Sequence, residues 1–214
     1  MPFGPASRLG VSLFDETPPV EWVPGRSDEE AESYIRAVYR QVLGNAYVME
    51  SERLAIPESQ FKLGELSVRE FVRAVAKSDL YQSRFFTSCP RYRAIELNFR
   101  HLLGRTPFDL EEMRMHSTIL DTEGFAADID SYIDSDEYWR SFGENTAPYL
   151  RGQKTEAGLK NVSFNRTLAI AGGNASNNSG KKAMLTSDLA GNRGTKIKSP
   201  KSSVSSTSGT TSRF

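Results

Sequence analysis

The sequence is poor in the residue types from which catalytic and metal sites are usually built. Its 214 residues include one cysteine, Cys89, and two histidines. A single cysteine excludes a disulfide within the chain and most cysteine-based zinc sites. No stretch reaches the ~18 apolar residues that a membrane-spanning helix needs, and the first residues lack a secretory signal. We therefore expect a soluble protein in a reducing compartment, with Cys89 a packed thiol rather than a nucleophile or a pigment-attachment site.

The net charge of zero conceals two parts of opposite sign. Residues 1–150 hold 16 Lys and Arg against 25 Asp and Glu, a net charge of −9. Residues 151–214 hold 11 against 2, a net charge of +9. From Gly172 onward the chain is rich in Gly, Ser, Asn and Lys, and it has too few apolar groups to offset its ordering entropy. We expect this tail to be disordered until a partner holds it.

Helical signals dominate the middle of the chain. Ser27 with Glu30, and Ser67 with Glu70, have the spacing of capping boxes. Apolar residues follow each start at helical spacing, and no convincing alternating strand precedes residue 150. The expected helices run over about 27–44, 67–75, 90–104, 109–120, 125–133 and 136–142. The sequence therefore predicts an all-α domain at 27–152, after an extended N-terminal arm at 1–26 and before a basic, largely irregular C-terminal extension at 153–214.

Two pairs of motifs indicate an internal repeat. Residues 38–45 (VYRQVLGN) match residues 98–105 (NFRHLLGR) at an offset of 60. Ser78-Asp79-Leu80-Tyr81 with Phe85 matches Ser135-Asp136-Glu137-Tyr138 with Phe142 at an offset of 57. Because the order and spacing recur, we expect two copies of one helical unit to pack around a shared core.

No constellation of residues supports catalysis or metal binding. His101 and His116 have no neighbouring ligand at metal spacing. A solvated helix face with a cap at Ser135 explains the acidic residues better than a calcium site, because they lack the loop pattern of such a site. These residues are Asp128, Asp130, Asp134, Asp136 and Glu137. Gly180-Lys181-Lys182 lacks the first glycine and the Ser or Thr of a phosphate-binding loop. We predict no catalytic residue, no metal and no enzyme.

A nucleic-acid-binding module that uses the basic tail is the alternative function. Basic residues interleaved with aromatics are typical of such modules. The helical domain is net acidic, however, and this opposes binding to a phosphate backbone. We therefore favour a reading without nucleic acid.

Several long blocks resemble phycobilisome rod linker polypeptides. The similarity covers roughly residues 7–168, and Phe164-Asn165-Arg166 looks like the F-x-R pattern that often follows the linker domain. The blocks are SRLGVSLF (7–14), YIRAVYRQVLGNAYVMESERL (34–54), LSVREFVRAVAKSDLY (66–81), AIELNFRHLLGRTPFD (94–109), DIDSYIDSDEY (128–138) and FGENTAPYLRG (142–152).

The resemblance implies a scaffold within a light-harvesting antenna. Such linkers lie in the central channel of phycobiliprotein α/β hexamers, either phycoerythrin or phycocyanin, where they organise stacking and contact neighbouring linkers. It implies that no cofactor is bound covalently and that the chain contacts bilins carried by its partners. It also implies a phycobilisome on the cytoplasmic face of cyanobacterial thylakoids or the stromal face in red-algal chloroplasts, so that the chain is peripheral to the membrane.

Aromatic and basic side chains are the candidates for this contact. An arginine near a bilin propionate, or a ring against the conjugated system, would alter the geometry and local field of the chromophore. Aromatics at helical spacing usually pack a core, so we expect about half of the candidates to do so. The candidates are Arg84, Phe85, Phe86, Arg91, Tyr92, Tyr138, Trp139, Arg140, Phe164 and Arg166.

Overall fold

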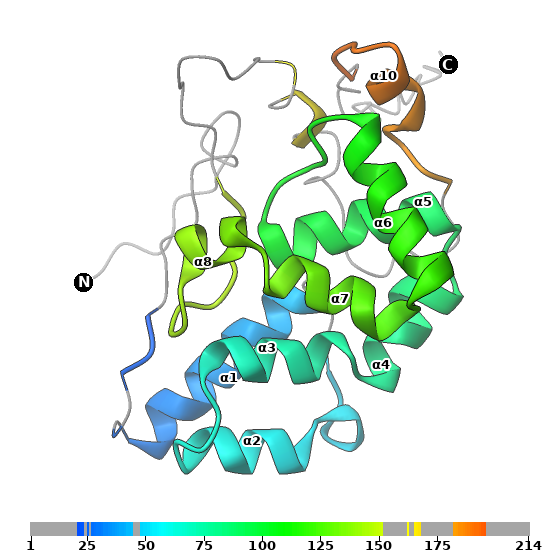
Figure 1. Cartoon of the computed structure of the whole chain (residues 1–214). Coiled ribbons are helices and arrows are strands. Elements are labelled where there is room, and N and C mark those ends of the chain that lie inside the picture. The colour runs from blue at the N-terminus through cyan, green and yellow to red at the C-terminus, as the bar shows by residue number, and fades with distance from the viewer. Residues whose placement is uncertain are drawn as a thin grey trace, which may run out of the picture.

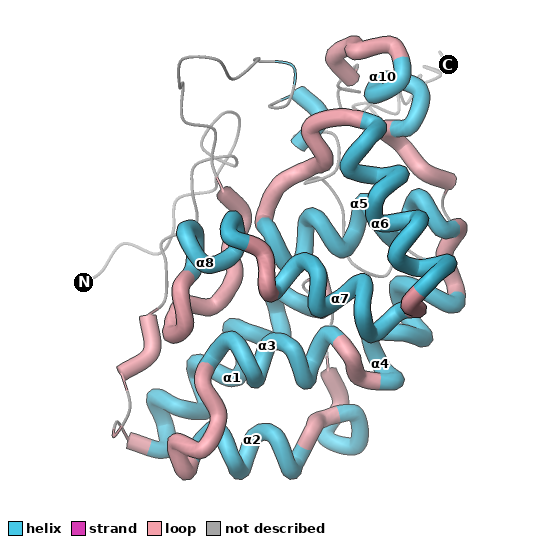
Figure 2. The backbone as a smooth tube through the Cα atoms, viewed as in Figure 1, coloured by secondary structure: helices cyan, strands magenta, loops and turns pink. Residues whose placement is uncertain are grey.

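The part of the protein that the structure describes is all-helical, as predicted. The computed structural model describes residues 21–23, 25, 27–44, 48–151, 162, 165–167 and 182–195. Figures 1 and 2 show helices joined by short loops, and the extended pairing in this part of the chain is one isolated bridge, Glu21 to Thr146. The named elements are α1 (Asp28–Val42), η2 (Glu50–Glu52), α2 (Ala55–Lys62), α3 (Val68–Ala76), α4 (Asp79–Tyr81), η3 (Gln82–Thr87), α5 (Arg91–Asn98), η4 (Phe99–Leu103), α6 (Leu110–Thr122), α7 (Phe125–Ile133), α8 (Asp136–Phe142) and α10 (Thr186–Ala190).

Serine and aspartate side chains begin most of the helices. The hydroxyl of Ser27 accepts a hydrogen bond from the Glu30 N–H, and the hydroxyl of Ser67 accepts one from the Glu70 N–H. These caps satisfy backbone N–H groups that have no partner within the helix. Both predicted starts are confirmed. At α5 the prediction is one residue early, because Pro90 is the cap residue and not the first helical position.

Two longer helical segments of the domain were missed by the prediction, α2 and the segment formed by α4 and η3 from Asp79 to Thr87. The sequence of α2 carries a weak helical signal. Helix α2 contains Pro57, which the rule against proline in helices would exclude. Pro57 lies in the first turn, where the N–H that proline lacks would have no partner in any case. Only Phe61 among its apolar side chains is fully buried, and Ile56 is 73% exposed. An apolar stripe was therefore not visible.

Two segments of the domain have a similar order of elements. We call α1 to η3 the first unit and α5 to α8 the second, and α3 and α7 hold equivalent places in that order. The Ser78 hydroxyl accepts from the Tyr81 N–H at 3.2 Å, and the Ser135 hydroxyl accepts from the Tyr138 N–H at 3.1 Å. Both tyrosines are completely buried. The repeated motif thus caps a helix and sends a tyrosine into the core.

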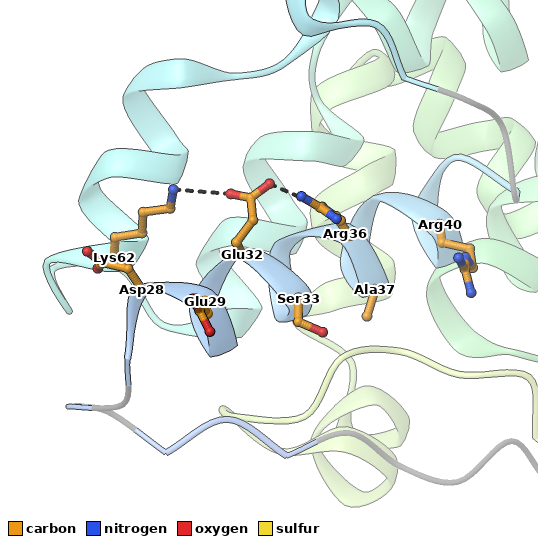
Figure 3. Close-up of a pocket in the computed structure, with 8 residues that line it drawn as sticks. All are labelled: Asp28, Glu29, Glu32, Ser33, Arg36, Ala37, Arg40 and Lys62. Atoms are coloured by element: carbon orange, nitrogen blue, oxygen red, sulfur yellow. Dashed lines mark hydrogen bonds and ion pairs between the residues drawn. The ribbon is translucent and has the colours of Figure 1, made fainter. Parts of the chain in front are cut away.

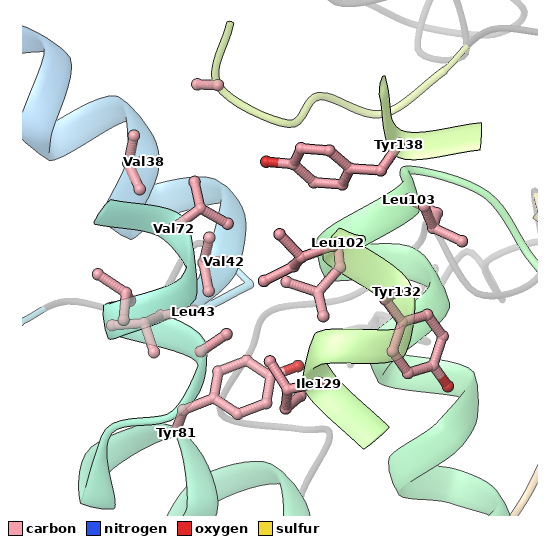
Figure 4. Packing of buried hydrophobic residues seen from close by; sticks show 14 of the residues in the cluster. Val38, Val42, Leu43, Val72, Tyr81, Leu102, Leu103, Ile129, Tyr132 and Tyr138 are labelled. Atoms are coloured by element: carbon pink, nitrogen blue, oxygen red, sulfur yellow. The ribbon is translucent and has the colours of Figure 1, made fainter. Parts of the chain in front are cut away.

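The two units share one hydrophobic core, as expected. Helix α1 contacts η4 and helix α3 contacts α7. Figure 4 shows Val38 and Val72 on one side of this core and Leu102, Ile129 and Tyr132 on the other. Each unit alone would leave this apolar face in water, so burial of the face against the other unit stabilises both.

The end of the N-terminal arm belongs to this core. Trp22 is buried, and its ring centroid lies 4.9 Å from that of Phe61 and 5.6 Å from that of Tyr34. Its backbone N–H donates to the Asn145 carbonyl at 2.8 Å. The Tyr34 hydroxyl donates to the same carbonyl and accepts from the Ala147 N–H. Chain segments from both ends of the domain therefore meet over α1.

The expectation of a disordered tail is wrong for one segment. Residues 182–195 contain the short helix α10, which contacts α6 (Figure 1). Leu185 and Leu189 are buried in the domain core. The low apolar content of the tail concealed these two leucines, because their burial depends on a surface far away in the sequence.

Ion pairs join α1 to the segment that holds α2. The Glu32 carboxylate lies 2.8 Å from Arg53 and 3.1 Å from Lys62, and Figure 3 shows its contacts with Lys62 and Arg36. The hydrogen bond from Arg53, and further that from Lys62, lowers the pKa of Glu32 to about 2.

Replacing Gly104 with alanine should destabilise the domain more than the same change at Gly64. Both glycines have positive φ, +66° and +76°, where a Cβ costs about 1–2 kcal/mol. A Cβ at Gly104 would also lie 1.9 Å from the Tyr149 carbonyl oxygen, whereas Gly64 faces open space. We expect Gly104→Ala to lower the free energy of unfolding by about 3 kcal/mol or more, and Gly64→Ala by about half of that. Urea unfolding followed by circular dichroism measures both, and equal losses would contradict the steric argument.

The Glu32 ion pairs should make stability depend on acidity. Because the pKa of Glu32 is lower in the folded state than its ordinary 4.5, its contribution is present above about pH 4.5 and is lost as pH falls towards 2. We expect Glu32→Gln to lower the free energy of unfolding by about 1–3 kcal/mol at neutral pH and by less at pH 3. Glu29→Gln, at an exposed position of α1, is the control. A Glu32→Gln loss that stays constant from pH 7 to 3 would be the contrary result.

Candidate functional site

An exposed tryptophan marks the outer face of α8. Trp139 is 56% exposed, and the guanidinium carbon of Arg69 lies 5.9 Å from its ring centroid. Arg69 is held in place by Asp134 at 2.5 Å and by the Ile133 carbonyl at 3.3 Å. The Trp139 indole therefore has a cationic neighbour, the Arg69 guanidinium, which is held at the end of α7. This contact restricts the motion of the indole before a partner binds.

The repeat does not require a tryptophan at this position. Trp139 and Arg140 correspond to Gln82 and Ser83 in the first unit, where the same fold forms without either side chain. Arg140 is highly exposed, and its contact with Asp136 is long, at 3.9 Å. Large exposed aromatic and arginine side chains are typical of binding hot spots. The pair Trp139 and Arg140, which we call the α8 anchor, is thus an addition to the fold and not a part of its core.

Two more predicted arginines lie at the surface with acidic partners. Arg84 on η3 pairs with Glu52 at 2.8 Å. Arg91 at the start of α5 pairs with Asp121 of α6 at 2.5 Å and is 46% exposed at its side chain. The Arg84–Glu52 pair is partly buried. The Arg91–Asp121 pair is exposed, and such pairs contribute little to stability, so the Arg91 guanidinium remains accessible to an anionic group of a partner.

Two predicted aromatics lie at the edge of the core. Phe86 is half-buried, with its ring centroid 4.8 Å from that of Phe125. Tyr92 is half-buried and packs against the same core. Each could offer part of its ring to a partner while the rest of the ring packs inside.

Phe85 and Tyr138 do not lie on the surface, which corrects their place among the candidates. Phe85 packs its ring 5.0 Å from Tyr81 and 4.7 Å from His101. Tyr138 is completely buried, and burial raises the pKa of its hydroxyl. Both belong to the repeated motif, so their equivalence with Phe142 and Tyr81 was the sequence signal that should have placed them inside.

Arg166 is also buried, and Phe164 lies outside the described residues. The Arg166 guanidinium donates to the carbonyls of Phe108 at 3.0 Å, Asp188 at 3.3 Å and Arg193 at 2.9 Å. Its Nε–H also donates to the Arg193 carbonyl at 3.1 Å. Arg166 is therefore buried against the C-terminal segment and holds it, rather than lying exposed for contact with a bilin.

The histidines have structural roles. The His116 Nδ1 lies 2.7 Å from the Asp128 carboxylate and 3.3 Å from the Ser131 hydroxyl, and its ring stacks on Tyr132 at 3.9 Å. Because aspartate and serine meet the same ring nitrogen, the imidazole cannot relay a proton between them. His101 is buried as expected, with its Nδ1 3.2 Å from the Tyr81 hydroxyl.

Three of the acidic residues expected on a solvated face have partners within the domain. Asp128 is buried and accepts from Asn98 at 3.2 Å. Arg73 of α3 binds Asp130 of α7 and Asp134, the residue that follows α7. Among the described residues, no group of three or more His, Cys, Asp or Glu could hold a metal ion. In the same part of the chain, no helix is long and apolar enough to cross a bilayer.

A shallow hollow along α1 was not predicted. Its volume is about 620 Å³, and acidic and basic side chains line it in equal number (Figure 3). Small side chains at its centre, Ser33 and Ala37, are one turn apart and leave the helix backbone open. The lining residues are Asp28, Glu29, Glu32, Ser33, Arg36, Ala37, Arg40 and Lys62.

Comparison with known proteins places these features in a family. The sequence model of the phycobilisome linker polypeptide family matches residues 26–151. The chain is 75% identical over 191 residues to the 31.8 kDa phycoerythrin-associated rod linker polypeptide of Microchaete diplosiphon, a match that covers 89% of this chain and 65% of that relative. It is 52% identical over 196 residues to the 27.9 kDa phycoerythrin-associated rod linker of the same organism, covering 91% and 78%.

A phycocyanin-associated relative is also similar. The chain is 48% identical over 199 residues to the 32.1 kDa phycocyanin-associated rod linker polypeptide of a Nostoc strain, covering 91% of this chain and 70% of that relative. The chain thus spans between 65% and 78% of the length of these three proteins. This protein belongs to the phycobilisome linker polypeptide family.

Proposed function

We propose that this chain is a rod linker of the phycobilisome. Its helical domain occupies the central channel of phycobiliprotein hexamers, organises their stacking and tunes the surroundings of their bilins for directional energy transfer. The observation that carries the proposal is the identity of 75% with a relative named as a phycoerythrin-associated rod linker. The role is that of a scaffold, and the pigments belong to the partner proteins.

The α8 anchor supplies the chemistry for such contacts. Bilins are acidic, conjugated chains, so an arginine can bind a propionate while an indole packs against the conjugated system. Trp139, Arg140 and Arg91 are exposed and able to reach a partner. Arg84, Phe86 and Tyr92 offer partial contacts at the edge of the core.

The division of charge supports a role between discs. The helical part is net acidic and the C-terminal part net basic, so the two parts suit different surfaces. We propose that the domain fits within one hexamer and that the basic extension reaches the neighbouring hexamer or linker. The assembly, and not a spanning helix, would place the chain at the thylakoid, on the cytoplasmic face in a cyanobacterium or the stromal face in a chloroplast.

Phycoerythrin is the partner that the similarities favour. The two relatives named as phycoerythrin-associated are 75% and 52% identical to this chain, against 48% for the phycocyanin-associated one. The alternative of a nucleic-acid-binding module has no support from the names of these relatives. The acidic domain also opposes it.

Purified full-length chain should bind phycoerythrin in preference to phycocyanin. Tagged protein is mixed with equal amounts of both, recovered, and the visible spectrum of the bound material is recorded. We expect the spectrum of phycoerythrin and its assembly into stacked discs under the electron microscope. Bound phycocyanin alone would overturn the choice of partner, and no bound phycobiliprotein would overturn the function.

Replacing Trp139 with alanine should weaken this binding without unfolding the domain. A buried interface tryptophan commonly contributes 2 kcal/mol or more, so the dissociation constant should rise about 30-fold or more. Met115→Ala is the control, since Met115 is similarly exposed, at 52%, but lies on α6. Binding is measured by interferometry and stability by thermal unfolding. A change in affinity that is equal for the two variants would remove the α8 anchor from the interface.

A further inference from the structure

A buried carboxylate receives the C-terminal segment. Glu96 of α5 is completely buried and accepts hydrogen bonds from the backbone N–H groups of Met184 at 3.0 Å and Leu185 at 2.7 Å. Arg93, also buried, donates to the same carboxylate at 2.9 Å. A buried charge is costly unless it is paired and hydrogen-bonded. Residues far along the sequence thus supply two of the bonds that Glu96 needs.

Two leucines fill apolar space beside this carboxylate. Leu185 is fully buried and Leu189 nearly so, one turn apart at the two ends of α10. They join the core cluster next to α6, which α10 contacts. Met184, the neighbour of Leu185, is 42% exposed. The segment therefore has one face that packs and one face in solvent.

A buried arginine holds the other end of the segment. The Arg166 guanidinium donates to the Asp188 and Arg193 carbonyls and to the Phe108 carbonyl just before α6. The Arg193 N–H in turn donates to the Asp188 carbonyl at 2.8 Å. The segment is thus held at its start by an acid and at its end by a base, with leucine contacts between them.

We propose that Glu96, Arg166 and the apolar surface of α5 and α6 form a docking site that is occupied by residues 182–195 of the same chain. We call these residues the strap. The strap fixes the place at which the remaining tail leaves the domain. Residues 196–214 carry four basic and no acidic side chains, so the strap directs a cationic tail from one defined point. This consequence for the tail rests on the proposed linker function, since it decides where the extension can meet a neighbouring disc.

The chemistry of the site explains its selectivity for this segment. The Glu96 carboxylate accepts hydrogen bonds from two adjacent backbone N–H groups, so these groups must have no partner within a helix. The apolar surface beside it takes two leucines four residues apart, which lie on one face of a helix. Burial raises the pKa of Glu96, while the Met184 and Leu185 N–H groups act in the opposite direction. Loss of the strap would leave the carboxylate short of partners. Docking of the strap and the charge on Glu96 are therefore coupled.

Hydrogen exchange on the full-length chain tests the docking directly. Leu185→Asp places a charge in the apolar site and should release the strap, so that amides of 185–193 exchange about 100-fold faster than in the unchanged protein. Ala190→Asp, at an exposed position of α10 that takes no part in the docking contacts, is the matched control and should leave them protected. Glu96→Gln should also accelerate exchange, because an amide is a weaker acceptor than a carboxylate. Amides of α1, α3 and α7 should stay protected in the two strap variants.

The outcomes separate the docking from the linker function. Equal exchange in Leu185→Asp and Ala190→Asp, or rapid exchange of these amides in the unchanged chain, overturns the docking site. The lengths of phycobiliprotein stacks, measured by electron microscopy, form the second arm, and we expect at least a two-fold shortening with Leu185→Asp only. If the variant releases the strap yet stacks are of normal length, the directing role is overturned and the docking stands. If the unchanged chain forms no stacks, the proposed function fails, and hydrogen exchange still decides the docking.

Discussion

The contact between α3 and α7 is the one on which the rest of the domain depends. It joins two helical units that each carry an apolar face too large to leave in water, and Arg73 adds ion pairs with Asp130 and Asp134 across the same seam. Since α1 packs on η4 in the same core, neither unit has a separate interior. The domain is therefore expected to fold as one cooperative body, in which a defect at the seam affects both units.

Repetition also explains which side chains are left over for function. The Ser-Asp-x-Tyr motif and the phenylalanine four residues later build the core twice, through Tyr81 with Phe85 and through Tyr138 with Phe142. A large residue that occurs in only one unit, lies outside this pattern and is exposed is free to serve another purpose. Trp139 is such a residue, exposed beside a fixed arginine. A linker needs such exposed anchors on an otherwise stable scaffold, because its role is to hold other proteins in register.

The C-terminal part of the chain has two roles, because one of its segments docks on the acidic domain and a basic segment follows it. Residues 182–195 are tied to the acidic domain by Glu96 and Arg166, while the basic residues that follow carry no compensating acid. Glu96 and Arg166 are buried charges, and each needs hydrogen-bond partners to offset the cost of its desolvation. Because residues 182–195 supply these partners, the site is specific for this segment. The scaffold thus presents a rigid surface at α8 and a charged tail that starts from a defined point.

The sequence by itself determined the all-α class, most helix boundaries, the repeat and the family resemblance, because caps and 3.6-residue periodicity are recorded in neighbouring residues. Helix α2 escaped because Pro57 lies in its first turn and its apolar stripe is narrow. Only the tertiary structure decided that Phe85, Tyr138 and Arg166 are buried and that Trp139 is exposed, and only it brought Leu185 to Glu96. Burial depends on which distant element covers a side chain, and local spacing holds no information about that cover.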